Sequence, residues 1–212
     1  MLHALRAELA YSRVWLLGGL GIGAGVSILM YVLKWFVDDA EGIPGFLTSI
    51  FLLIAGMVVS FIVQSYRWEE KRTRLLLAGP LTPRQLAGVT VLLPACLMVV
   101  GALASALMIG LTALISGHLD LADLHMTAVF GVEFWAYAQM GPLVQETTAA
   151  RRQGRGRAAF AGWAVFAVAV LLLAAGMFFR HLIQANLGQM TAIVMSMVVA
   201  ARLYTGRTDY TR

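Results

Sequence analysis

The sequence predicts an all-α integral membrane protein with six transmembrane helices and both termini in the cytoplasm. Its 212 residues are 60% hydrophobic and 13% charged, whereas soluble domains average roughly 25% charged residues. Long apolar runs follow one another along the chain, and the basic residues gather in every second connection between them. The chain is predicted to form one transmembrane domain over residues 1–212.

Each apolar run is predicted to be a helix that crosses the bilayer. About 20 apolar residues span the hydrocarbon core, and backbone amides in lipid must find partners within their own segment. The predicted runs are Val14–Val37, Phe46–Tyr66, Leu86–Ser116, Met126–Val144, Ala158–Phe179 and Leu187–Leu203. Pro94 is a candidate kink in the third run, because proline removes a helical hydrogen bond.

The basic residues orient the predicted helices. All 16 except Lys34 and Arg180 fall on the side that holds the N-terminus, residues 67–85, residues 146–157 and the C-terminus. The positive-inside rule makes that side the cytoplasm and predicts a multi-pass protein of a bacterial inner membrane. The net charge of +5 is then matched by anionic lipid headgroups, and no nucleic-acid-binding motif is present.

Residues 1–13 precede the first run and admit two interpretations. Leu2, Leu5 and Leu9 recur at helical spacing, which favours a short amphipathic helix in the cytoplasmic interface. The alternative is a simple charged flank.

Four glycines in the first run, spaced by two residues, form a candidate packing seam. Gly19 and Gly23, and likewise Gly21 and Gly25, are four residues apart, which lets a neighbouring helix approach closely. We expect them to pack helices, with a dimer seam as one use of the same stripe.

Glu133 is the acidic residue of the fourth run and a candidate intramembrane polar site with Tyr137 and Gln139. A carboxylate in hydrocarbon costs at least a few kcal/mol, so such residues face the protein interior and usually have a role. Three interpretations stay open: contact with cargo, proton relay, or a position near the outer interface where water reaches it.

Other features predict no chemistry. The single cysteine, Cys96, falls inside the third run and cannot form an internal disulfide. The histidines and aspartates of residues 117–125 match no established metal-site spacing, so no metal site is predicted. No set of catalytic residues stands out.

The segment of residues 67–85 is predicted to be a short cytoplasmic helix, a turn at Gly79-Pro80 and the start of the next helix. Thr82 can cap that helix, and Pro83 suits its first position. By itself, this pattern fits either a protein-docking helix or a basic loop held by lipid phosphates.

The same segment resembles the coupling segment of ABC-2-type transporter permeases. That family carries a glutamate, basic residues, a leucine run and a Leu-Pro-Leu/Val-Ser/Thr-x-x-Gln sequence between its second and third helices. The matching residues here are Glu69, Glu70, Lys71, Arg72, Arg74, Leu75, Leu76, Leu77, Pro80, Leu81, Thr82 and Gln85. Gly79 stands where the family often has leucine.

The resemblance implies a permease subunit, half of a transmembrane pore, most often an exporter. Its coupling residues would be Glu69, Glu70, Arg72, Arg74 and Leu75–Leu77. A separate cytoplasmic ATPase would bind ATP and Mg, and a second permease chain, the same or similar, would complete the pore. The chain itself lacks a P-loop, because its two lysines, Lys34 and Lys71, do not follow glycine. It is therefore expected to be neither an enzyme nor a cofactor-binding protein by itself.

Two other functions remain open at this point. The chain could be a membrane scaffold or assembly subunit that transports nothing. It could also be a small ion-coupled transporter built around Glu133.

Overall fold

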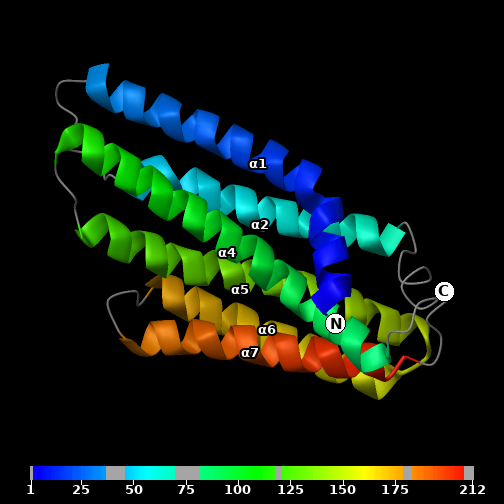
Figure 1. Cartoon of the computed structure of the whole chain (residues 1–212). Helices are drawn as coiled ribbons and strands as arrows, with labels where there is room; N and C mark the ends of the chain where they lie inside the picture. Colours follow the sequence, from blue (N-terminus) through cyan, green and yellow to red (C-terminus); the bar gives the residue numbers. More distant parts are fainter. Residues whose placement is uncertain (1, 37–45, 70–81, 118–120, 179–182, 208–212) are drawn as a thin grey trace.

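The described residues of the computed structural model form six long α-helices. The structure describes residues 2–36, 46–69, 82–117, 121–178 and 183–207. The helices are α1 (Leu2–Phe36), α2 (Phe46–Glu69), α4 (Pro83–Ser116), α5 (Leu121–Arg152), α6 (Gly156–Phe178) and α7 (Ile183–Thr205). They lie side by side, and α1 begins at the end of the bundle where α7 ends (Figure 1).

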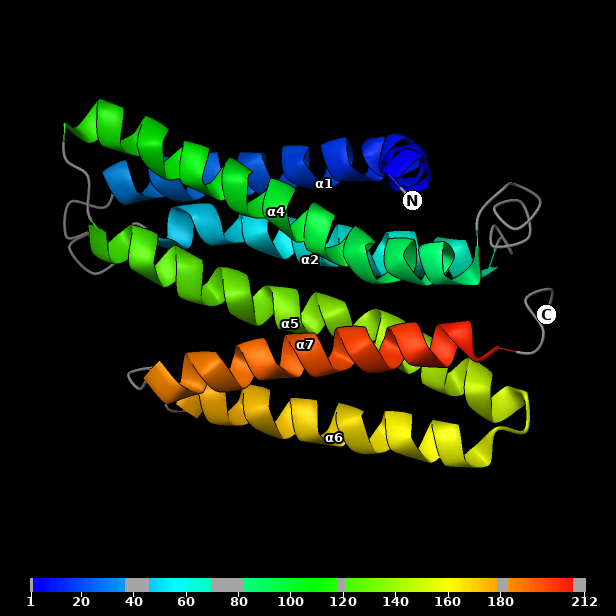
Figure 2. The same cartoon turned by 60° about the horizontal axis from the view of Figure 1, so that its bottom comes forward.

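The bundle has two groups of three helices. One group contains α1, α2 and α4, and the other contains α5, α6 and α7 (Figure 2). Helix α5 joins them, because it packs against α2 and α4 on one side and against α6 and α7 on the other. The prediction of an all-helical protein is confirmed for the described residues.

Five of the six helices are long and apolar enough to span a membrane: α1, α2, α4, α6 and α7. Helix α5 is long enough but the least apolar of the six. Its polar residues include Glu133, Gln139, Glu146 and Thr147, all buried by its four neighbours. The structure thus shows a multi-pass membrane protein with five candidate spans, and a sixth span stays a prediction.

Several helices extend beyond the predicted apolar runs. Helix α5 continues through residues 146–152, and α6 begins at Gly156 after a tight turn in which Gly154 has a positive φ of 72°. Most of the polar segment of residues 146–157 is therefore helical. Glu146 and Thr147 face the interior there, so the last two turns of α5 add buried surface beyond the apolar run.

The N-terminal segment is helical and continuous with α1. The hydroxyl of Ser12 donates to the carbonyls of Glu8 (2.9 Å) and Leu9 (3.1 Å), an arrangement that bends helices. The first turns of α1 accordingly lie steeply across the remainder of the helix (Figure 1). The placement of residues 1–13 in a membrane interface stays a prediction.

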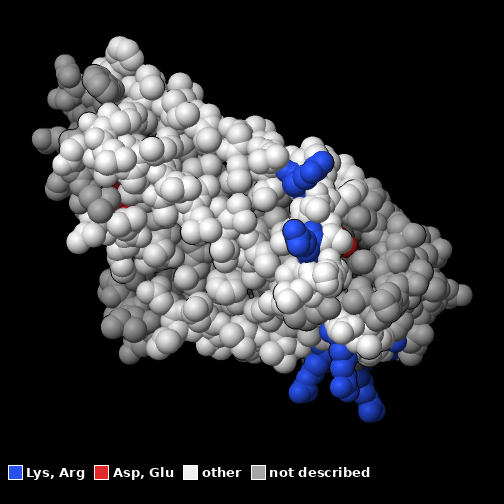
Figure 3. Space-filling view, in the orientation of Figure 1, with Lys and Arg blue, Asp and Glu red and all other residues white. Residues whose placement is uncertain are grey.

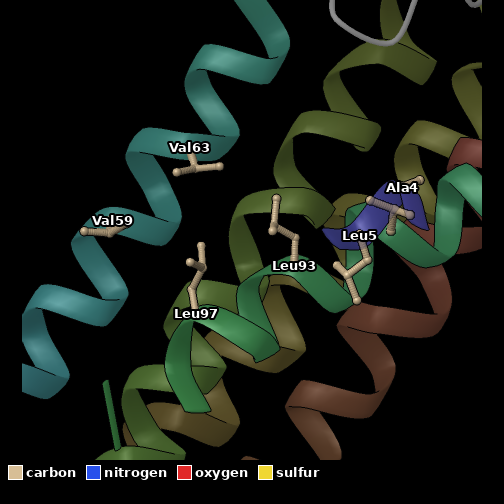
Figure 4. Packing of buried hydrophobic residues seen from close by; sticks show 7 residues of the cluster. Ala4, Leu5, Val59, Val63, Leu93 and Leu97 are labelled. Carbon is tan, nitrogen blue, oxygen red and sulfur yellow. The ribbon is translucent and has the colours of Figure 1, made fainter. Parts of the chain in front are cut away.

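A core cluster joins the bent start of α1 to α2 and α4. Its members are Ala4, Leu5, Val59, Val63, Val89, Leu93 and Leu97. Figure 4 shows Leu5 beside Leu93, with Val59 and Val63 projecting from α2. Leu5 is buried whereas Leu2 is exposed, so only one edge of the predicted leucine stripe packs against the protein.

Candidate functional site

The end of the bundle where the termini lie carries the described basic side chains. Every arginine whose side chain the structure describes lies there, in the first four turns of α1, near another helix end or in a turn. These residues are Arg6, Arg13, Arg84, Arg151, Arg152, Arg155, Arg157, Arg202 and Arg207. Figure 3 shows the blue side chains of the visible face gathered at this end.

The predicted coupling segment starts and finishes at the same basic end. Helix α2 ends at Glu69 and α4 begins at Pro83. Residues 70–81 lie outside the described residues, and so do the side chains at the end of α2. The predicted coupling residues Glu70, Arg72, Arg74 and Leu75–Leu77 therefore have no described geometry, and only the backbone of Glu69 does.

The start of α4 has the predicted capping arrangement. The backbone N–H of Gln85 donates to the Thr82 hydroxyl at 3.3 Å, and the Thr82 N–H donates to the Gln85 side chain at 2.9 Å. Pro83 occupies the first turn. This reciprocal capping box fixes where α4 begins and hence where the preceding segment must end.

Glu133 lies inside the bundle and is only 3% exposed. It shares a face of α5 with Ala136, Tyr137 and Met140, which lie three, four and seven residues further on. That face packs on α6 and α7: Ala136 and Met140 belong to a cluster with residues of both helices, and the Tyr137 hydroxyl donates to Met177 at 3.4 Å. Glu133 is thus buried among the described residues, and its three interpretations stay predictions.

Gln189 of α7 is a second buried polar group at the same level, which sequence reasoning missed. It is 1% exposed, and neither polar atom of its amide has a hydrogen-bond partner among the described residues. It lies one turn before Ala192, which packs in the same cluster as Ala136, and α5 and α7 run in the same direction (Figure 1). A glutamine within an otherwise apolar run was the available signal.

A glycine of α6 makes room for this amide. A Cβ added to Gly176 would lie 2.6 Å from the Gln189 Nε2 atom. Side chains from α5 and α7 and the backbone of α6 therefore gather at one interior level of the second helix group.

Gln139 has a structural role that differs from its predicted place beside Glu133. It is fully buried and donates from Nε2 to the carbonyl of Val91 at 3.3 Å. Gln139 thus belongs to the α4–α5 contact, on another face of α5 from Tyr137.

The glycine stripe of α1 divides between two faces. A Cβ on Gly23 would lie 2.9 Å from the Phe51 carbonyl oxygen, and a Cβ on Gly19 would strike Val59, so both glycines bring α1 close to α2. Gly21 and Gly25 have nothing within 4 Å of an added Cβ. Half of the stripe therefore packs within the chain, and the other half lies on its open surface.

An ion pair that sequence reasoning missed holds the basic ends of α5 and α7 together. Arg207 donates to both carboxylate oxygens of Glu146 at 2.8 Å, and the two side chains are 7% and 3% exposed. The Arg207 guanidinium also lies 5.0 Å from the centre of the Tyr204 ring, and Arg155 donates to the Leu203 carbonyl at 3.1 Å. No sequence pattern links residues 61 positions apart.

Within the described part of the chain, no group of three or more His, Cys, Asp or Glu side chains could hold a metal ion. No protein-family model, no curated protein and no solved structure matches the chain. A proposed function therefore rests on the sequence of the chain and on the geometry of its described residues.

Proposed function

We propose that the chain is the membrane-spanning permease subunit of an ATP-driven ABC-2-type transporter, most simply an exporter. The observation that carries this proposal is the sequence of residues 67–85, which resembles that family's coupling segment. The ends of α2 and α4 support it, since both helices deliver this segment to the arginine-rich end of the bundle.

The proposed membrane arrangement has six spans, with α5 as the sixth. Four surrounding helices bury the polar residues of α5, so it need not be apolar all round to cross the bilayer. The positive-inside rule then places the arginine-rich end, with both termini, in the cytoplasm of a bacterial cell. There the coupling segment would meet a separate ATPase that supplies ATP and Mg.

A second permease chain would complete the pore. The open glycines Gly21 and Gly25 of α1 offer a surface on which another helix can approach closely.

Affinity purification from the native membrane in mild detergent tests the coupling proposal. We expect a stoichiometric P-loop ATPase to be retained by the tagged chain and lost when Glu69→Gln, Arg72→Gln and Arg74→Gln are combined. The matched control combines Arg151→Gln, Arg152→Gln and Arg157→Gln, which remove exposed arginines from the α5–α6 corner of the same end. This control should keep the ATPase.

Three results would count against coupling through residues 67–85. Equal loss of the ATPase in both triple variants would indicate general electrostatic attraction. Retention in the first variant would place the contact elsewhere. Recovery of other membrane proteins, without an ATPase in any of several detergents, would favour a scaffold.

A second candidate function is ion-coupled transport through Glu133. Its specific support is the burial of Glu133 and Gln189 at one level between α5, α6 and α7. Intramembrane carboxylates are frequent members of proton relays. Proteoliposomes of the chain alone would then dissipate an imposed pH gradient, and Glu133→Gln would abolish the flux. No flux above empty liposomes would remove this candidate.

A further inference from the structure

A groove runs along the surface between α4 and α5. Its volume is about 310 Å³, and it extends on α4 from Ala95 to Ala106 and on α5 from Leu124 to Trp135. It begins one residue beyond Pro94, and proline is a common site of helix kinks. Small side chains keep the groove open, among them Ala102 and Ala128.

The groove lies on the exposed outer surface of the bundle. The large α4 side chains beside it are exposed, with Val99 at 55%, Leu103 at 60% and Leu107 at 69%. Among the described lining residues, only Thr127 and Trp135 carry polar side-chain atoms, and the Thr127 hydroxyl lies 3.4 Å from that of Ser49. An apolar occupant therefore fits this surface better than water or a polar solute.

The dimensions of the groove select one kind of apolar occupant. The span from Ala95 to Ala106 corresponds to ~16 Å of helix, close to the ~15 Å of hydrocarbon in one leaflet. A narrow groove of this length fits one extended hydrocarbon chain better than a helix, whose diameter is ~10 Å.

The deep end of the groove is closed. One turn before Ala95 on α4, Val91 packs on Leu143, and its carbonyl accepts the hydrogen bond from Gln139. A molecule that enters from the bilayer therefore stops near the level of Trp135. This closure favours a resident lipid over a cargo route through the protein.

We propose that this groove binds one acyl chain of a membrane phospholipid from the leaflet on the side of the α4–α5 connection. The chain lies along α4 from the level of Ala106, and its methyl end reaches Trp135. The inference requires that the helices span a bilayer, and it is independent of coupling to an ATPase.

Trp135 makes the proposal measurable, because it is a fluorophore in the groove wall. The full chain with Trp15, Trp35, Trp68 and Trp163 replaced by phenylalanine leaves Trp135 as the single tryptophan. This protein is reconstituted in bilayers of phosphatidylcholine brominated either near the methyl end or near the carboxyl end of the acyl chain. Bromine quenches indole fluorescence on contact, and we expect the methyl-end label to quench Trp135 more strongly.

Filling the groove should abolish that quenching. Ala102→Phe combined with Ala128→Phe places two rings in the groove, and we expect loss of methyl-end quenching of Trp135. The matched control combines Ala164→Phe with Ala167→Phe, at exposed positions of α6 outside the groove, and should leave the quenching unchanged. In a protein that keeps Trp163 instead of Trp135, the fluorescence reports contact with ordinary surface lipid. Its quenching should not change when the groove is filled.

Several outcomes would overturn the proposal. If Trp135 is quenched equally before and after the groove is filled, Trp135 contacts surface lipid alone. Absence of quenching in the unfilled protein would leave the groove without a chain, and a shift in oligomeric state on filling would then assign the face to a second copy. If the filled variant is not monodisperse, the depth profile of the unfilled protein decides, and stronger carboxyl-end quenching contradicts the proposal.

Discussion

Single glycines set the distance between α1 and α2. Gly23 lies against the backbone of Phe51 and beside Ala55, so the two helices touch through main-chain atoms at this level. Gly21, two residues earlier, lies on a different face of α1 with open space around it. Replacing each glycine with alanine therefore separates the steric effect of an added methyl group from its effect on helix propensity.

Gly23→Ala should destabilise the protein, whereas Gly21→Ala should not. Overpacking at a tight helix contact costs typically 1–3 kcal/mol, and the alanine at position 21 gains up to ~1 kcal/mol of helix propensity. The free energy of unfolding in mixed micelles measures both changes. If the two variants were equally stable, α1 would not lie on α2 in the way described.

Gln189 and Glu146 show what residue types alone do not reveal. Both are common surface residues, and their burial depends on neighbours that are distant in the sequence. Glu133 could be singled out because an acidic residue interrupts an apolar run. Whether its side chain is buried in the protein became clear only from the packing of α5.

At the scale of helices, the basic ends of α5 and α7 depend on each other through Glu146 and Arg207. The pair is bidentate and nearly fully buried, and Arg207 is the second residue after α7 ends. A buried pair of this kind contributes little net stability against an apolar substitute, but loss of one partner leaves a buried charge.

Glu146→Leu or Arg207→Met alone should each lower the free energy of unfolding by about 3–5 kcal/mol, since each leaves one buried charge uncompensated. The double variant should recover much of that loss. A double-mutant cycle by unfolding in mixed micelles checks the coupling. Strictly additive losses would mean that the two side chains do not interact.

Helix boundaries divide into those that local sequence specifies and those that packing specifies. Thr82 and Pro83 predict the start of α4, because the capping box is local chemistry. The extension of α5 through residues 146–152 could not be predicted in this way. Its polar residues Glu146 and Thr147 are buried against neighbouring helices, and hydropathy along one helix does not record a neighbour.

At the scale of the whole molecule, the sequence predicts a helical membrane bundle well. Five of the six apolar runs have centres within two residues of the helix centres, because the bilayer restricts spanning segments to a narrow choice of structure. The first run differs because α1 also includes residues 2–13. The grouping into three and three, the enclosure of α5 and the α4–α5 groove follow from tertiary contacts that no run of residues encodes.

Labelling in intact cells tests whether α5 crosses the membrane. In a Cys96→Ala background, a cysteine in place of exposed Leu121 should react with a membrane-impermeant maleimide. A cysteine in place of exposed Arg152 should react only after the cells are opened. Reaction of both in intact cells, or of neither, would contradict the six-span arrangement with cytoplasmic termini.

The enclosure of α5 also has a consequence for biosynthesis. This helix leaves the ribosome before α6 and α7, at a time when half of the surface that will shield its polar residues does not yet exist. It is thus a poor candidate for independent release into lipid, and α7 supplies the last shielding face. In a nascent chain stalled before α7, the polar residues of α5 would be only partly shielded. Such a chain would become a target for membrane quality-control proteases. Arg207, which follows α7, would then be among the last residues to reach the buried end of α5, where it pairs with Glu146.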